Sequence, residues 1–193
     1  LMADGFFTAI KTSASQFISK SISSDFTILD ENILLNNIDK IENMTPNGKI
    51  LPKPFSLIEY NVFLKCVNDL LKNLDFGDHM ELFRVPVLRY KPAIPVNNDR
   101  NYSTETAHLE AWFGHSKDTI TIQIPLFGDL EKNYTALLSP PDEFEESWLD
   151  PLDDFKDGSK IAQKYIQKKV LNNPRIMKVF ESSTLHQTIR EDG

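Results

Sequence analysis

The apolar positions in the first part of the chain follow a helical period. Apolar side chains recur every three to four positions over residues 6–22 and again over residues 54–74, which is the spacing of one face of an amphipathic helix. Residues 30–41 carry a shorter stretch of the same pattern, and Pro54 suits the first turn of the second long helix. We therefore predict a mostly helical segment over residues 1–80.

The pattern then changes to the alternation that is typical of β-strands. Residues 119–126 alternate between polar and apolar side chains and are rich in β-branched residues, as expected for a half-buried strand. Further strands are predicted at residues 82–90, 134–138 and 175–180. Pro86 places the first of these at a sheet edge or a bulge.

The remaining segments are an acidic excursion and one more helix. Residues 142–158 are acidic and loop-like, which fits a lid over a site or a solvated excursion. Residues 159–171 have a helical period, with Ser159 as the expected N-cap. Helices followed by short strands indicate a mainly β domain with flanking helices, and a double-sheet jelly roll fits this series. We expect a single domain over residues 1–193, with residues 81–193 as its jelly-roll core.

Composition and charge narrow the classes of partner. The 193 residues are 40% hydrophobic, enough to build a sizeable core. A net charge of −7 disfavours binding to nucleic acid or to an anionic membrane. No apolar run approaches the roughly 18 residues that a membrane-spanning helix needs. We therefore expect a small-molecule substrate and no nucleic-acid or membrane partner. A homo-oligomer is compatible with this composition.

The cysteine content excludes several chemistries. Cys66 is the only cysteine, so it cannot form an internal disulfide or a paired-cysteine zinc site. Its apolar neighbours predict a buried structural thiol, and a reducing, cytoplasmic compartment fits best. The chain also lacks a glycine-rich phosphate loop, a dinucleotide fingerprint and a nucleophile-elbow sequence.

The segment 106–112 (TAHLEAW) carries the strongest candidate for chemistry. His108 and Glu110 are two positions apart, so their side chains point to the same side if the segment is extended. His186, far along the chain, can supply a third ligand. Two histidines and one carboxylate on one face of a metal ion, with open positions opposite, is the arrangement found in non-haem Fe(II) oxygenases.

Each of these residues also has a structural interpretation. His108 can serve as a hydrogen-bonded residue on a sheet face, Glu110 as a surface ion-pair partner and His186 as a strand cap. His115 is an alternative third ligand, although its position directly after Gly114 favours a loop residue.

Residues 106–129 resemble the metal-binding core of Fe(II)/2-oxoglutarate dioxygenases. The chain is similar to the phytanoyl-dioxygenase-like group, which includes a streptomycin-biosynthesis-associated protein. The shared features are His-x-carboxylate followed by Trp-x-Gly, a strand that ends in Ile-Pro, and a following Gly-Asp. Residues 180–187 (FESSTLHQ) resemble the segment that carries the distal histidine of the family. The likeness covers residues 82–193.

The resemblance implies a double-stranded β-helix, a cupin-like jelly roll, that binds Fe(II) through His108, Glu110 and His186. It also implies 2-oxoglutarate as cosubstrate and the hydroxylation, or another C–H oxidation, of a small biosynthetic metabolite. Gln123 and Arg89 are the candidates for cosubstrate binding. Gln123 lies on the polar face of its strand, and Arg89 lies in an early strand where it can neutralise a carboxylate.

Two features depart from the pattern of the family. The family has Asp where this chain has Glu110, whose extra methylene moves the carboxylate by about 1.5 Å. The family also places an Arg about ten residues beyond the distal histidine, where it pairs with the far carboxylate of 2-oxoglutarate. Arg190 comes too early for that position, so we expect the chain to be truncated and such an Arg to follow Gly193.

Two other functions remain open on the same scaffold. One is a cupin-type metal-binding sugar isomerase or epimerase, which the absence of a His-x-His motif disfavours. The other is a non-catalytic binding domain.

Overall fold

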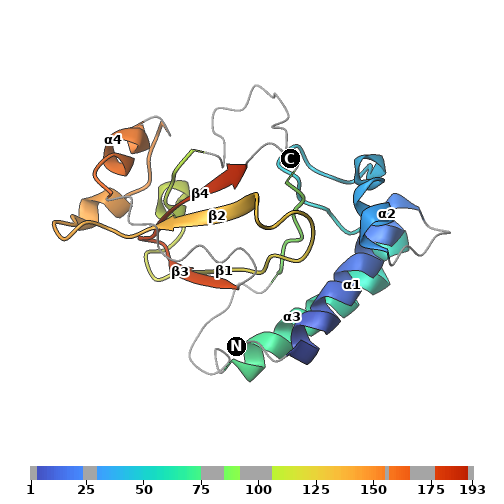
Figure 1. Ribbon diagram of the computed structural model, residues 1–193. Coiled ribbons are helices and arrows are strands. Elements are labelled where there is room, and N and C mark those ends of the chain that lie inside the picture. Colours follow the sequence, from blue (N-terminus) through green and yellow to red (C-terminus); the bar gives the residue numbers. More distant parts are fainter. Residues whose placement is uncertain are drawn as a thin grey trace. The chain divides into compact units, whose positions relative to one another are not determined.

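The computed structural model describes residues 4–23, 30–74, 85–91, 106–154, 157–165 and 177–190. The chain divides into two compact units, Leu1–Pro92 and Ala93–Gly193. The first unit contains helices α1 to α3, and the second contains all four strands (Figure 1). The division between a helical part and a strand-rich part agrees with the sequence, while a single domain stays a prediction. No helix in the described ranges is long and apolar enough to cross a membrane.

Two long helices pack against each other in the first unit. They are α1 (Asp4–Ile22) and α3 (Leu57–Asn73), and the rings of Phe17 and Tyr60 meet between them with centroids 5.2 Å apart. The 3-10 turn η2 (Pro54–Ser56) leads into α3. Both long helices predicted from the apolar period are therefore confirmed.

Two short helices occupy the predicted segment 30–41. They are α2 (Glu31–Leu35) and the 3-10 helix η1 (Ile38–Lys40). The carboxylate of Asp30 accepts a hydrogen bond from the backbone N–H of Ile33 at 3.0 Å, which caps α2. The core of this unit is formed by the buried side chains of Ile10, Ala14, Phe17, Ile18, Leu34, Ile38, Ile41, Ile50, Phe63, Val67, Leu70 and Leu88.

The strand predicted at residues 82–90 does not form over residues 85–91. This segment makes one isolated bridge, between Lys49 and Arg89, and is otherwise irregular. Pro86 has no N–H to donate to a ladder, and the valines on both sides of it are exposed. The first three residues of the predicted strand lie outside the described residues.

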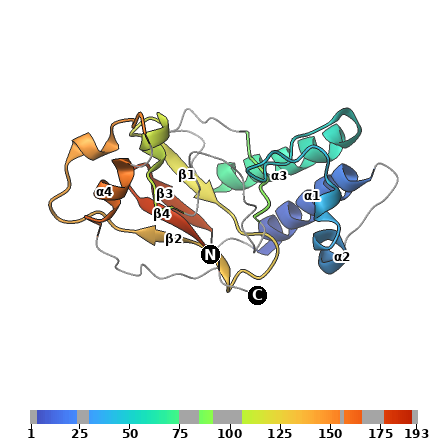
Figure 2. The same ribbon diagram turned by 90° about the horizontal axis from the view of Figure 1, so that it is seen from above.

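The four strands found among the described residues of the second unit form two antiparallel pairs. Strand β1 (Ile120–Gln123) pairs with β3 (Lys178–Glu181), and β2 (Asn133–Leu138) pairs with β4 (Leu185–Arg190). The β2–β4 pair is drawn above the β1–β3 pair in Figure 1, and Figure 2 shows both pairs from above. Consecutive strands therefore alternate between the two sheets. The described residues contain fewer strands than the eight of a jelly roll, so the jelly roll stays a prediction.

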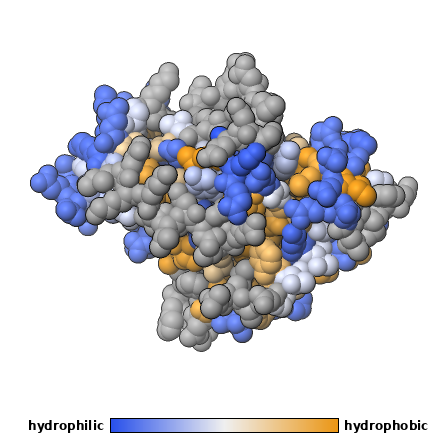
Figure 3. All heavy atoms as spheres, viewed as in Figure 1, coloured by the Kyte–Doolittle hydropathy of each residue, from blue (hydrophilic) through white to orange (hydrophobic). Residues whose placement is uncertain are grey.

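The described residues of the second unit also form three short helices. They are η3 (Glu110–Phe113), η4 (Glu146–Leu149) and α4 (Gly158–Ala162). The N-cap position of α4 is occupied by Asp157, so the prediction that Ser159 caps this helix is wrong. The predicted acidic excursion contains η4, and the end of the unit that carries η4 and α4 is largely hydrophilic in Figure 3.

A hydrophobic cluster forms the core of the second unit. The indole Nε1–H of Trp112 donates to the backbone carbonyl of Trp148 at 2.8 Å. Gly158 lies so close to Trp112 that a Cβ atom there would be 2.4 Å from the ring, so this close approach of α4 to the cluster requires a glycine. The buried members are Leu109, Ala111, Trp112, Trp148, Leu149, Tyr165 and Leu185.

Candidate metal site

An isolated antiparallel bridge brings His108 and His186 together. The backbone N–H of each residue donates to the carbonyl of the other, at 2.9 and 3.0 Å. Residues that are directly opposed in an antiparallel pair have side chains on the same face. The two imidazole centroids are accordingly 4.2 Å apart.

Buried leucines next to the histidines fix the direction of the site. Leu109 and Leu185 are both 0% exposed and belong to the hydrophobic cluster. Leu109 has extended backbone angles (φ −104°, ψ 142°), so the side chains of His108 and Glu110 project to the side opposite Leu109. The predicted shared face of His108 and Glu110 agrees with this geometry, although Glu110 begins the turn η3 and does not continue a strand.

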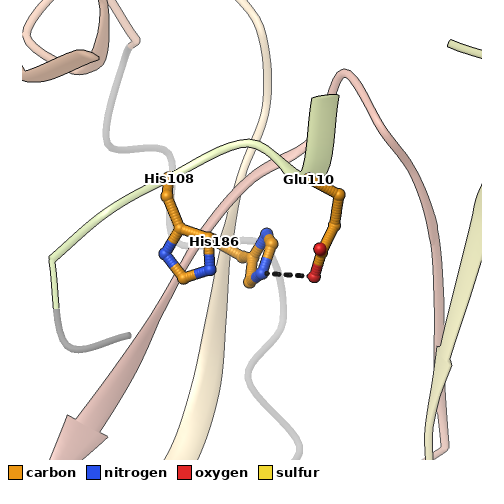
Figure 4. A group of neighbouring side chains, drawn as sticks. All are labelled: His108, Glu110 and His186. Atoms are coloured by element: carbon orange, nitrogen blue, oxygen red, sulfur yellow. Dashed lines mark ion pairs between the residues drawn. The ribbon is translucent and has the colours of Figure 1, made fainter. Parts of the chain in front are cut away.

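The three predicted ligands lie together (Figure 4). One ligand atom from each of His108, Glu110 and His186 lies within 4.8 Å of the others. Nε2 of His186 is 3.4 Å from Oε1 of Glu110, and Figure 4 shows the His186 ring between the His108 ring and the carboxylate. Both histidines are 4% exposed, while the side chain of Glu110 is 23% exposed.

Backbone carbonyls orient both imidazoles. Nδ1 of His108 lies 2.7 Å from the carbonyl oxygen of Thr106, and Nδ1 of His186 lies 3.3 Å from that of Thr184. A carbonyl can only accept, so Nδ1 donates in each contact, and Nε2 is the ring nitrogen that could bind a metal ion. Metal-binding histidines characteristically have such a partner on the other ring nitrogen.

The surroundings of Glu110 favour its ionised form. The contact with His186 is the largest influence and lowers the pKa of the Glu110 carboxyl below its usual value. Burial acts in the opposite direction, and the neighbouring histidines His108 and His115 add to the lowering. The site therefore presents a carboxylate anion beside two imidazoles.

This donor set fits a divalent first-row metal such as Fe(II). Ligand atoms on one face of an octahedral metal ion, each about 2.1 Å from it, lie about 3 Å apart. The ligand atoms of this group lie within 4.8 Å of one another, so the side chains would have to move up to roughly 2 Å closer together to bind an ion. Three protein ligands would leave coordination positions for small molecules.

His115, the alternative third ligand, lies at the edge of this group. Its Nε2 is 3.8 Å from Oε2 of Glu110, and its side chain is 56% exposed. It follows Gly114, whose positive φ of 81° ends the turn η3. The structure thus brings His186, and not His115, into the group of three.

The two predicted cosubstrate residues lie in different units. Gln123 is opposite Lys178 in the β1–β3 pair, and Phe180 lies on the same face as Lys178, with its ring 4.8 Å from the His186 ring. Gln123 is therefore on the face that looks toward His186. Arg89 is exposed and belongs to the first unit. The role of either residue in cosubstrate binding stays a prediction.

The sequence did not reveal the groups that support the ligands. The carbonyls of Thr106 and Thr184 are backbone groups, so no side chain signals their role. Phe180 packs on His186, and Phe113 meets His108 edge-on with ring centroids 5.5 Å apart. Phe113 is itself exposed.

The group of two histidines and one glutamate has the composition of a mononuclear metal site. Comparisons of the chain with models of known protein families, with curated proteins and with solved structures find no match. Any functional assignment therefore depends on the residues of this site and on the motif at residues 106–129.

Proposed function

We propose that this protein is an Fe(II)- and 2-oxoglutarate-dependent dioxygenase that oxidises a C–H bond of a small metabolite. The observation that carries the proposal is the convergence of His108 and Glu110 with His186, which lies far along the chain, at one largely buried point. These residues would hold the iron, which when bound supplies the activation of dioxygen.

The strand connections support the jelly-roll part of this proposal. The turn at residues 182–184 joins β3 to β4, which belong to different sheets. Strands that switch sheets in this way build two-layer β-domains. The bridge to His108 also gives β4 a neighbour on the side away from β2, so His186 lies in the interior of its sheet.

The residues of the chain would position the reacting molecules and exclude water. The carbonyls behind His108 and His186 fix both rings, and the buried ring of Phe180 shields His186 on one side. Gln123 and Arg89 are the proposed cosubstrate contacts. The net charge of −7 supports a small-molecule substrate rather than nucleic acid, and the single cysteine supports a cytoplasmic location.

The direct test is an anaerobic titration with Fe(II) and 2-oxoglutarate. A weak visible charge-transfer band is expected, because a 2-oxo acid that chelates Fe(II) produces one. The band should disappear in His108→Ala and in His186→Ala. His115→Ala is the matched control, because this exposed histidine is close to Glu110 but outside the group of three.

Other outcomes select other functions. The absence of a band in the intact protein would favour the non-catalytic binding domain. Fe(II) binding that 2-oxoglutarate does not perturb would favour the cupin-type isomerase or epimerase. A band that survives in His186→Ala and is lost in His115→Ala would replace His186 by His115 as the third ligand.

A further inference from the structure

The ring of Phe113 lies at the edge of the metal group. It meets the ring of His108 with centroids 5.5 Å apart and an interplanar angle of 89°, while 41% of the residue is exposed. Single exposed apolar side chains are common on protein surfaces and need no explanation by themselves. The position of this ring, in contact with a candidate metal ligand, is what makes it informative.

The turn η3 places Phe113 on the same side as the carboxylate ligand. Glu110 and Phe113 are the first and last residues of this 3-10 turn, three positions apart. Side chains at this spacing eclipse one another in a 3-10 helix. The ring therefore lies on the side of the turn from which Glu110 reaches His186. The contact between Phe113 and His108 is a separate observation that agrees with this placement.

The neighbours of Phe113 hold the turn in place. Ala111 and Trp112 are buried in the hydrophobic cluster, and the indole of Trp112 donates to the carbonyl of Trp148 at 2.8 Å. The backbone N–H of Gly114 donates to the carbonyl of Ala111 at 3.0 Å, which closes the turn. A molecule that packs against Phe113 would therefore be held by a well-anchored element beside the metal group.

The metal group is most accessible on this side. Both of its histidines are buried, whereas Glu110 is partly exposed and the neighbouring His115 is exposed. A Cβ atom on Gly114 would meet no atom of the described residues within 4 Å, so there is open space next to the turn. A small molecule that approaches the group from the side of Glu110 would therefore come close to Phe113.

We infer that Phe113 is a substrate-recognition residue, and that the oxidised molecule has an apolar portion, aromatic or aliphatic, which packs against this ring. The inference rests on the proposed function, because it assigns the substrate class of the same site. Small-molecule sites are lined mainly by apolar and aromatic side chains, with a few polar groups that fix the orientation. A fully polar substrate would bury little apolar surface against Phe113.

The test uses the full chain loaded with Co(II), a spectroscopic substitute for Fe(II), and two probes, imidazole and 4-phenylimidazole. Both probes should bind the metal through a ring nitrogen and change the visible Co(II) spectrum, but only the second adds an apolar ring. The measured preference is the Kd of imidazole divided by the Kd of 4-phenylimidazole. We expect Phe113→Ala to lower this preference at least about threefold, and Phe113→Tyr, which keeps an aromatic ring, to retain it.

Val179→Ala is the matched control. Val179 is exposed to nearly the same degree, 42%, but it lies on the face of β3 opposite to Phe180, whose ring contacts His186. This variant should show the preference of the wild type. If Phe113 served only to shield His108, Phe113→Ala would weaken the binding of both probes equally and leave the preference unchanged.

The inference is overturned if Phe113→Ala keeps the wild-type preference, or if Val179→Ala loses it as well. Should Phe113→Ala fail to fold, Phe113→Gln provides a second variant with a polar side chain, and the same loss of preference is expected. Failure of the intact chain to bind Co(II), or of the loaded chain to bind imidazole, would refute both the proposed function and this inference. A preference that depends on Phe113, without any Fe(II) and 2-oxoglutarate band, would refute the proposed dioxygenase alone and leave the apolar recognition standing.

Discussion

The longer side chain of Glu110 suits the backbone on which it sits. The chain is extended through Leu109 and then turns into η3 at Glu110. An aspartate at the start of this turn would hold its carboxylate nearer to the backbone by about 1.5 Å. The extra methylene of glutamate lets Oε1 reach to 3.4 Å from Nε2 of His186. The glutamate at this position therefore has a local structural reason.

Glu110→Gln should weaken metal binding while the fold is kept. The substitution preserves shape but removes the only negative charge of the group, which we expect to lower the affinity for Fe(II) or Co(II) at least about tenfold. Competition with a metal-sensitive dye would measure this. Glu143→Gln, at an exposed acidic position of the same unit, is the control. Equal affinities of the two variants would remove Glu110 from the ligand set.

The site residues differ in how far the sequence could reveal them. His108 and Glu110 are related by strand alternation, which is a local rule, so their spacing alone predicted a shared direction. His186 could be assigned only through the resemblance of residues 180–187, because no local rule links it to His108. The carbonyls that orient both rings depend on tertiary pairing and leave no trace in the amino-acid types.

At the scale of elements, Tyr165 connects the α4 region to the turn that precedes β4. Its hydroxyl donates to the carbonyl of Ser183 at 2.9 Å, and its ring packs in the cluster beside Trp148. Burial raises the pKa of Tyr165 to about 12 from the usual value of 10.0. Since Ser183 is three residues before His186, this contact helps to hold the start of the ligand strand.

Tyr165→Phe should change both the stability and its dependence on alkaline pH. Loss of the hydrogen bond is expected to cost about 1 kcal/mol. In the wild type the unfolded state ionises first, so the free energy of unfolding should be unaffected below about pH 10 and fall between about pH 10 and pH 12. Urea unfolding at about pH 9 and about pH 11 should show a smaller loss of stability in the variant. An identical loss in both proteins would show that Tyr165 does not ionise in this range.

The elements were predictable where the apolar period is long. The helices α1 and α3 bury a continuous stripe of side chains and were found close to their observed bounds. Strand β4 was missed, because LHQTIR contains only two apolar residues and owes its conformation to pairing with β2 and to the bridge at His108. The strand predicted at residues 82–90 has the reverse combination. It carries apolar valines, but among the described residues these valines have no partner strand, so residues 85–90 form no strand.

At the scale of the whole molecule, the second unit holds all that the metal group requires. His108, Glu110 and His186 lie in it, together with the hydrophobic cluster behind them. The first unit has its own core and contributes none of the three ligands.

Residues 93–193 expressed alone should therefore bind Fe(II) or Co(II) with an affinity within about threefold of that of the full chain, because the ligands and their supporting core are retained. Isothermal titration of the two proteins would measure the difference. A folded fragment that binds no metal would show that the helical unit completes the site. Loss of 2-oxoglutarate binding with retained metal binding would agree with a role for Arg89.

The two backbone hydrogen bonds between His108 and His186 hold the residues that carry the two imidazoles together. A fluctuation that opens this bridge would separate His186 from His108 and Glu110, which lie on one segment, so the opened form would lack the complete group of three. A metal ion that binds all three ligands would bind only the closed form. It would therefore stabilise the folded state relative to every form in which the bridge is open. Metal occupancy of the group and closure of the bridge between His108 and His186 would therefore be coupled.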